Sequence, residues 1–133
     1  MGIDDAARIA ASETVTLVEL QREVSAFYRV RDWEKFQTLK DLAAGISIEA
    51  AELQQLFLWR EGSDSQTIFD ERRAEIEEEF ADVFIHCLNF ARQAELDIEA
   101  VVRHKLAVND AKYPVAKVKG RVVPHQARNS CAR

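Results

Sequence analysis

The chain has 133 residues, of which 47% are apolar and 31% charged, and its formal net charge is -5. A chain of this length forms one domain that can bury about two thirds of its extended surface. It contains only two prolines and four glycines. This scarcity argues against an all-β sandwich or barrel, which needs many tight turns.

The sequence predicts neither membrane insertion nor export. It holds no run of about 18 apolar residues, as a transmembrane helix would need. The acidic start, Met1 to Asp5, lacks the basic and apolar regions of a secretory signal. Two cysteines, Cys87 and Cys131, are too few for a disulfide framework. We therefore expect a cytoplasmic protein with reduced thiols and no membrane partner.

Charge is distributed unevenly along the chain. Residues 115–133 hold five basic side chains and no acid, whereas the preceding 114 residues hold 13 basic and 23 acidic side chains. An acidic body does not suit nucleic-acid polymers, whose affinity comes mainly from phosphate neutralisation. We predict a flexible basic tail over 115–133 and no polymer partner. A tail that touches nucleic acid, a membrane or the chain's own acidic surface is the alternative.

The hydrophobic period is helical almost throughout. The expected helices span about 14–28, 38–60, 66–94 and 98–113, followed by an extended arm. Thr38 with Asp41 three residues on, and Asp97, are the expected N-caps, Gly62 is the expected stop of the second helix, and the fourth ends before Pro114. Four helices with short links predict an all-α four-helix bundle. The third helix, roughly 40 Å long, would stay partly uncovered in one chain, so we expect a dimer or dimer of dimers.

The second predicted helix carries a carboxylate where packing would favour leucine. Its apolar stripe consists of Leu42, Ile46, Leu53 and Leu56. Glu49 lies in the middle of that stripe and Glu52 one helical step to its side. A glutamate on a core face must be neutralised, paired or bound to a metal, because an isolated buried carboxylate is very costly.

The third predicted helix repeats this arrangement with Glu79, Asp82 and His86 along the flank of its apolar stripe. Residues three apart lie on neighbouring turns, so Glu49, Glu52, Glu79 and Asp82 can converge on one pocket. Oxygen-only ligands favour Mg²⁺ first and Mn²⁺ second. His86 is expected to hydrogen-bond a ligand or substrate. A solvated acidic surface is the alternative, whereas a di-iron site would need histidine three residues after each glutamate.

The fourth predicted helix supplies the opposite charge. Lys105, Asn109 and Lys112 or Tyr113 recur on one face, where a cation and an amide can hold phosphate oxygens. An ordinary amphipathic helix with exposed lysines is the alternative. Trp33 and Trp59 lie on either side of the second helix and can stack on a planar base, or can belong to a core or interface.

These motifs resemble a known family. The segment Glu49-Ala50-Ala51-Glu52, followed after 26 residues by Glu79-Phe80-Ala81-Asp82, resembles the E-x-x-E…E-x-x-D signature of the MazG-like, all-α nucleoside triphosphate pyrophosphohydrolases. The resemblance covers about residues 17–114, and it suggests a helical domain over 1–114. The flanks look like the dCTP pyrophosphatase branch: Arg31 to Phe36, Phe57 to Trp59, Asn109, and Lys112-Tyr113-Pro114.

The resemblance implies Mg²⁺-dependent hydrolysis of a (deoxy)nucleoside triphosphate, dCTP or a modified dCTP, to the monophosphate and pyrophosphate. It also implies that the four acids named above are catalytic and hold the metal, and that the protein is a homotetramer. The residues expected to bind substrate are Trp33, Gln37, Trp59, His86, Lys105, Asn109, Lys112 and Tyr113.

Three departures from the branch matter. Ile48 stands where many family members carry another glutamate, Gln37 where the branch commonly has histidine, and His86 where it commonly has tyrosine. Because the last two positions lie near the nucleotide in relatives, the preferred base stays open. A dUTPase-like or broad-range pyrophosphatase is the nearer alternative. A non-catalytic helical module whose acids bind basic residues of a partner is the further one.

Overall fold

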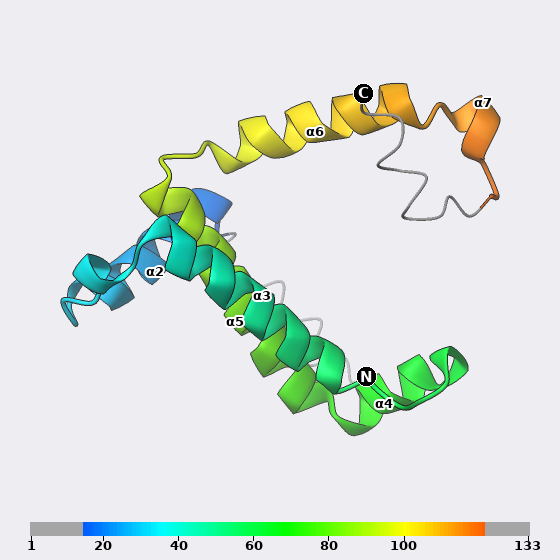
Figure 1. The fold of residues 1–133 in the computed structure, drawn as a ribbon, viewed down its shortest axis with the longest axis horizontal. Coiled ribbons are helices and arrows are strands. Elements are labelled where there is room, and N and C mark those ends of the chain that lie inside the picture. Colours follow the sequence, from blue (N-terminus) through cyan, green and yellow to red (C-terminus); the bar gives the residue numbers. More distant parts are fainter. Residues whose placement is uncertain (1–14, 122–133) are drawn as a thin grey trace. The chain divides into compact units, whose positions relative to one another are not determined.

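The computed structural model describes residues 15–121, and every regular element within that range is helical (Figure 1). The all-α fold class is therefore confirmed. None of these helices is long and apolar enough to cross a bilayer. Thr14, the segment from residue 122 onward and Cys131 lie outside the described residues. The elements are α2 (Leu17–Arg29), a 3-10 turn (Glu34–Phe36), α3 (Leu39–Gln55), a 3-10 turn (Gly62–Asp64), α4 (Ser65–Glu71), α5 (Arg73–Gln93), α6 (Ile98–Lys112) and α7 (Val115–Val118).

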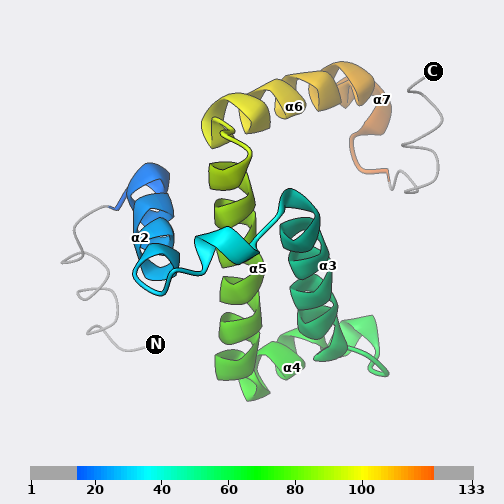
Figure 2. The same ribbon diagram turned by 60° about the vertical axis from the view of Figure 1, so that its left-hand side comes forward.

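The described chain divides into two compact units, residues 15–95 and 96–121. In the first unit α5 is the central element, because it contacts α2, α3 and α4. Helices α3 and α5 run antiparallel beside each other (Figure 2). The second unit consists of α6 and α7. Packing of α6 into a four-helix bundle therefore stays a prediction.

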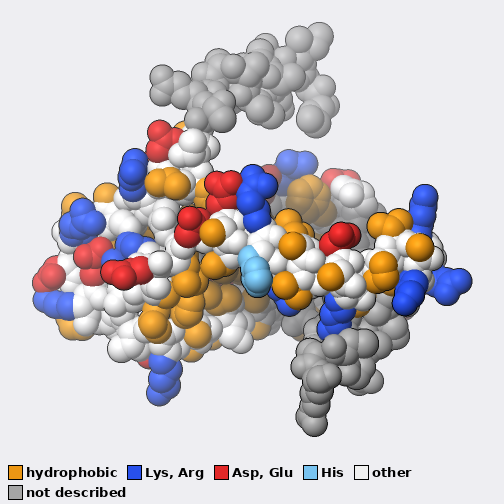
Figure 3. Space-filling model, turned by 90° about the horizontal axis from the view of Figure 1, so that it is seen from above, with side chains coloured by type: hydrophobic (Ala, Val, Ile, Leu, Met, Phe, Trp, Pro, Cys, Tyr) orange, Lys and Arg blue, Asp and Glu red, His pale blue; other side chains and the backbone are white. Residues whose placement is uncertain are grey.

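The core of the first unit is small and lies where α5 meets its neighbours. Leu42 on α3 and Leu88 on α5 are its most buried apolar side chains. The other buried apolar residues are Val24, Tyr28, Ile68, Ile76 and Ala91. Several large apolar side chains remain at the surface, among them Ile48, Phe80 and Phe84. The face drawn in Figure 3 shows apolar side chains between acidic and basic ones.

The predicted helix starts are confirmed at α3 and α6. The Thr38 hydroxyl accepts a hydrogen bond from the Asp41 backbone N–H, and the Asp41 carboxylate accepts one from the Thr38 N–H. The Thr38 hydroxyl also donates to the Asp41 carboxylate. This bond, followed by the one from the Thr38 N–H, lowers the pKa of Asp41. The Asp97 carboxylate accepts from the N–H of Ala100. A second capping box, at Thr16, starts α2 at Leu17 instead of residue 14.

Other predicted boundaries are wrong. Helix α3 ends at Gln55, before the expected Arg60, and Gly62 begins a 3-10 turn. The expected third helix is broken at Arg72, which has non-helical backbone angles. Its guanidinium donates to the carbonyl of Leu56 beyond the end of α3 and to the carboxylate of Glu75 in the first turn of α5. The long helix on which the expected assembly was based is therefore two shorter ones.

The segment after Pro114 is also different from the expected extended arm. Val115–Val118 forms one helical turn, and the carbonyl of Pro114 accepts hydrogen bonds from the N–H groups of Lys117 and Val118. Proline favours helix starts, because its fixed φ suits the first turn and its missing N–H is not needed there. Val115–Val118 is therefore helical instead of extended. The rest of the tail prediction is not tested, since the tail beyond Arg121 lies outside the described residues.

The capping box of α3 allows a stability test. Thr38→Ala removes the hydroxyl that accepts from the Asp41 N–H, so it should lower the free energy of unfolding by about 1 kcal/mol. Urea unfolding followed by circular dichroism measures this loss. Thr38→Ser, which keeps the hydroxyl, should stay close to wild type. Equal losses in both variants would contradict the capping role.

Candidate functional site

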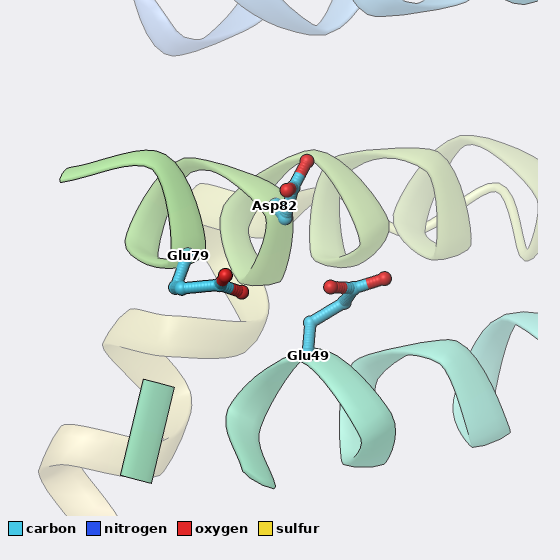
Figure 4. A group of neighbouring side chains, drawn as sticks. All are labelled: Glu49, Glu79 and Asp82. Atoms are coloured by element: carbon cyan, nitrogen blue, oxygen red, sulfur yellow. The ribbon is translucent and has the colours of Figure 1, made fainter. Parts of the chain in front are cut away.

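Three carboxylates from the two antiparallel helices converge in the first unit (Figure 4). Glu49 extends from α3 towards Glu79 and Asp82 on α5. Each side chain offers one oxygen, and these three oxygens all lie within 4.8 Å of one another. Glu49 and Glu79 are half-buried, whereas Asp82 is exposed. The spacing of the two acid pairs thus places carboxylates from both helices at one point.

Glu49 occupies the buried side of α3, as its place in the apolar stripe predicts. Its side chain is only 20% exposed, whereas Glu52 is exposed. Glu52 is not part of the group of three, but its charge acts on Glu79. The structure therefore brings three of the four predicted acids together and places the fourth beside Glu79.

Glu79 lies in the least favourable surroundings for a negative charge. Its Oε2 atom is buried and has no hydrogen-bond partner among the described residues. Burial raises the pKa of Glu79, and the charges of Glu52, Asp82 and Glu49 raise it further. A buried acceptor without a donor is rare in folded proteins, because desolvation of the group is not compensated. This oxygen is therefore suited to a cation.

His86 fills the space between the two helices next to the acids. Its Nδ1 lies 3.0 Å from the backbone carbonyl of Asp82 and 3.9 Å from Oε1 of Glu49. Because a carbonyl only accepts hydrogen bonds, the neutral ring must carry its proton on Nδ1. The opposite side of the ring lies against Gly45 on α3, where an added Cβ would come within 2.8 Å of Nε2.

Gly45 was not predicted as a site residue, although its position inside a helix is a sequence signal. A glycine inside a helix destabilises it by about 1 kcal/mol relative to alanine, so an internal glycine indicates a close approach. Here the close approach is that of the His86 ring. Gly45, Glu49 and His86 therefore form one packed unit at the α3–α5 contact.

The donor set fits a hard divalent cation. Mg²⁺ and Mn²⁺ prefer carboxylate oxygens, and no sulfur is among the three ligand candidates. Glu79 Oε2, buried and without a donor, supplies the observation that a cation would explain. His86 uses its Nδ1 proton on the protein backbone, so it is placed to support the acids instead of ligating with that nitrogen.

The predicted base-binding residues of the first unit lie on its loops. Trp33 is half exposed and packs edge to face on Phe27 and Tyr28, with ring centroids 6.1 and 6.2 Å apart. Trp59 is 96% exposed, and its φ of 65° is in the left-handed region that non-glycine residues rarely adopt. Gln37, between the 3-10 turn and α3, contacts the buried Asn89, a residue that the sequence analysis missed.

The predicted phosphate-binding residues all belong to the second unit. Lys105 and Asn109 are four residues apart on α6, with Lys105 exposed and Asn109 half-buried. Lys112 ends the helix, and its Nζ lies 5.5 Å from the ring centroid of Tyr113. The structure thus places these four side chains on α6 or directly after it, as the spacing predicts.

Comparison with known proteins assigns the family. A model of the MazG-like family matches residues 44–122, which contain all three clustered acids. The chain belongs to the MazG-like family. The resemblance stated from the acid motifs is therefore confirmed.

Curated relatives of this MazG-like chain include dCTP pyrophosphatase 1 of Rattus norvegicus, 31% identical over 107 residues. The match covers 79% of this chain and 63% of the relative, so the chain spans less than two thirds of its length. The bovine protein of the same name is 31% identical over 111 residues, or 82% and 66% of the two chains. A pyrophosphatase structure from Archaeoglobus fulgidus superimposes with a TM-score of 0.72 at 36% identity, covering 77% of this chain and 96% of that one.

The raised pKa of Glu79 predicts how pH affects stability without metal. The folded protein binds the Glu79 proton more tightly than the unfolded chain. Stability is therefore gained as the pH falls from neutrality through the raised pKa of Glu79 towards the ordinary pKa of a glutamate. Glu79→Gln, which stays neutral, should be more stable than wild type at about pH 7 in EDTA. This advantage should shrink as the pH falls and Glu79 takes up its proton, as urea unfolding can measure. An advantage that does not change with pH would contradict the assignment.

The contact between Gly45 and His86 predicts that Gly45→Ala changes the free energy of unfolding in opposite directions with and without the histidine ring. Gly45→Ala alone should lower the free energy of unfolding, because the new Cβ collides with the ring. In a His86→Ala background the same change should raise it by up to about 1 kcal/mol, since alanine is the better helix former. A double-mutant cycle measured by urea unfolding gives both values. Stabilisation of equal size in both backgrounds would show that the ring does not require the glycine.

Proposed function

We propose that this MazG-like protein hydrolyses a (deoxy)nucleoside triphosphate to the monophosphate and pyrophosphate, with dCTP or a modified dCTP as the favoured substrate. The observation that carries the proposal is the convergence of Glu49, Glu79 and Asp82 around a buried carboxylate oxygen without a donor. The names of the relatives, dCTP pyrophosphatase 1 and a pyrophosphatase, support the substrate class.

The acids require a divalent cation for this chemistry. A triphosphate is strongly anionic and is repelled by four carboxylates. We assign Glu49, Glu79 and Asp82 as ligands of Mg²⁺, or of Mn²⁺ in its place, with Glu52 beside them. When bound, such a cation neutralises phosphate charge and lowers the pKa of water for attack on phosphorus.

The remaining acid is the candidate general base. Glu52 is exposed and lies outside the group of three, yet near enough for its charge to act on Glu79. A carboxylate not engaged as a ligand is free to take the proton of the attacking water. His86, hydrogen-bonded to the backbone of Asp82 and close to Glu49, keeps those two acids in place.

Residues of the second unit carry positive charge of the kind that a triphosphate requires. Lys105, Asn109, Lys112 and Tyr113 on and after α6 are assigned to the phosphates, because charge-assisted hydrogen bonds from lysine and amide donors suit phosphate oxygens. Trp33, Gln37, Trp59 and His86 are assigned to the nucleoside. A base other than cytosine is the alternative, favoured by Gln37 and His86, which replace the residues common in the dCTP branch.

We also propose that the protein assembles as a dimer or a dimer of dimers. Ile48 on α3 and the stacked rings of Phe80 and Phe84 on α5 expose large apolar surfaces, with Phe80 60% exposed. The stacked, exposed rings of Phe80 and Phe84 form apolar surface of the kind found in helix-on-helix interfaces between subunits. Light scattering after size exclusion gives the subunit number directly.

The function is tested by incubating the protein with Mg²⁺ and a panel of common and modified (d)NTPs, with separate detection of pyrophosphate and orthophosphate. Wild type should release pyrophosphate. Glu49→Gln and Asp82→Asn should each lower kcat/KM about 100-fold or more, because each removes the negative charge of a metal ligand. Both variants should also lose the increase in melting temperature that Mg²⁺ gives to wild type.

The matched control is Glu61→Gln, the same chemical change at an exposed acid outside the cluster. It should keep wild-type kinetics. Release of orthophosphate alone would indicate attack at the γ-phosphorus and contradict the proposal. Activity within about threefold of wild type in Glu49→Gln and Asp82→Asn would remove these residues from the metal role.

A further inference from the structure

A buried polar network connects α5 to the loop before α3. Asn89 on α5 is 1% exposed, and a buried amide needs hydrogen-bond partners. Nε and Nη2 of Arg92 donate to its Oδ1 over 3.2 and 3.1 Å, and its Nδ2 donates to Oε1 of Gln37. We call Arg92, Asn89 and Gln37 the amide relay.

The relay has a fixed direction. A guanidinium carries donors and no acceptor, so Asn89 must turn its Oδ1 towards Arg92 and its Nδ2 towards Gln37. Gln37 must in turn present its Oε1 to Asn89. The amide of Gln37 cannot rotate by 180° without placing two donors against each other. Its Nε2 therefore faces away from Asn89, and it has no hydrogen-bond partner among residues 15–121.

The first member of the relay is itself anchored. Nη1 of Arg92 lies 3.5 Å from Oε1 of Glu34, with both side chains mostly buried. Glu34 begins the 3-10 turn that leads directly to Gln37. The Arg92 guanidinium thus holds the loop and also fixes which way the Asn89 amide points. This orientation does not depend on solvent.

The relay lies on the same side of α5 as the acids. Asn89 comes seven residues after Asp82, which is two helical turns and about 10 Å along the axis. His86 lies between them and contacts the acid cluster. Under the proposed function Gln37 belongs to the nucleoside end of the site, and its Nε2 donors are the ones that the relay leaves unused.

We propose that the amide relay fixes Gln37 as a hydrogen-bond donor to the substrate, so that the protein selects a nucleobase that presents an acceptor at this point. The proposal rests on the proposed function. Gln37 contacts the base, and Asn89 and Arg92 are positioning residues. The O2 and N3 atoms of cytosine are acceptors of the required kind, whereas a base edge with only donors would be rejected.

Two variants should replace the donor that position 37 presents to the substrate with an acceptor, each in a different way. Asn89→Asp still accepts from Arg92, but it presents a second acceptor to Gln37, which must turn its Nε2 inward and its carbonyl towards the substrate. Gln37→Glu presents an acceptor directly. The control Gln54→Glu makes the same amide-to-acid change on the exposed side of α3.

The readout is kcat/KM with Mg²⁺ for dCTP, dUTP, dTTP, dATP and dGTP. Both reversing variants should lower kcat/KM for the substrate that wild type prefers by about tenfold or more. Both variants should also change the ratios of kcat/KM between the five substrates in the same direction. Binding of pyrophosphate with Mg²⁺, which involves no base, should stay within about twofold of wild type. Gln54→Glu should keep both rates and ratios.

The outcomes distinguish a failure of the relay proposal from a failure of the proposed function. If wild type hydrolyses no member of the panel, the proposed function fails and the relay proposal fails with it. If wild type is active and both variants keep its base ratios within about twofold, the relay alone is overturned. Equal losses for every base together with weaker pyrophosphate binding would also overturn it, since Asn89 would then be only structural. Should Asn89→Asp not fold, Gln37→Glu decides the outcome.

Discussion

Repulsion between acids held at the α3–α5 contact is the constraint on which the rest of the first unit depends. Glu49, Glu79 and Asp82 have oxygens within 4.8 Å of one another, and one oxygen of Glu79 is buried without a donor. Like charges at this range destabilise each other more strongly where water is partly excluded. The packing around them must therefore hold the helices together against this repulsion.

The surrounding residues meet that constraint with close packing. Gly45 has no side chain, so the His86 ring lies directly against α3 while its Nδ1 is bonded to the backbone of α5. Buried Leu42 and Leu88 add apolar contact along the same helices. One turn further along α5, Asn89 ties the loop before α3 to the same helix. Apolar packing and directed hydrogen bonds thus hold the two helices together on the side of the acids where Gly45 and His86 lie.

The local features of the fold could be predicted from the sequence, whereas contacts between distant residues could not. Capping by Thr38 and Asp97 depends on residues three apart, and the acid pairs follow from helical spacing, so the pattern was sufficient. The break at Arg72 is marked by neither glycine nor proline. It depends on a bond from Arg72 to the carbonyl of Leu56, 16 residues away. The role of Asn89 could not be predicted either, because its hydrogen-bond partner Gln37 lies 52 positions earlier in the chain.

The bond between Arg72 and Leu56 has a consequence for how such sequences can change. It joins the two ends of the segment between α3 and α5 at its base. Lengthening a segment whose ends are already held together adds only a slowly growing entropic term. Insertions or deletions between Trp59 and the buried Ile68 should therefore leave the distance between Glu49 and Glu79 unaltered. Evolution is free to remodel this part of the surface without disturbing the acids.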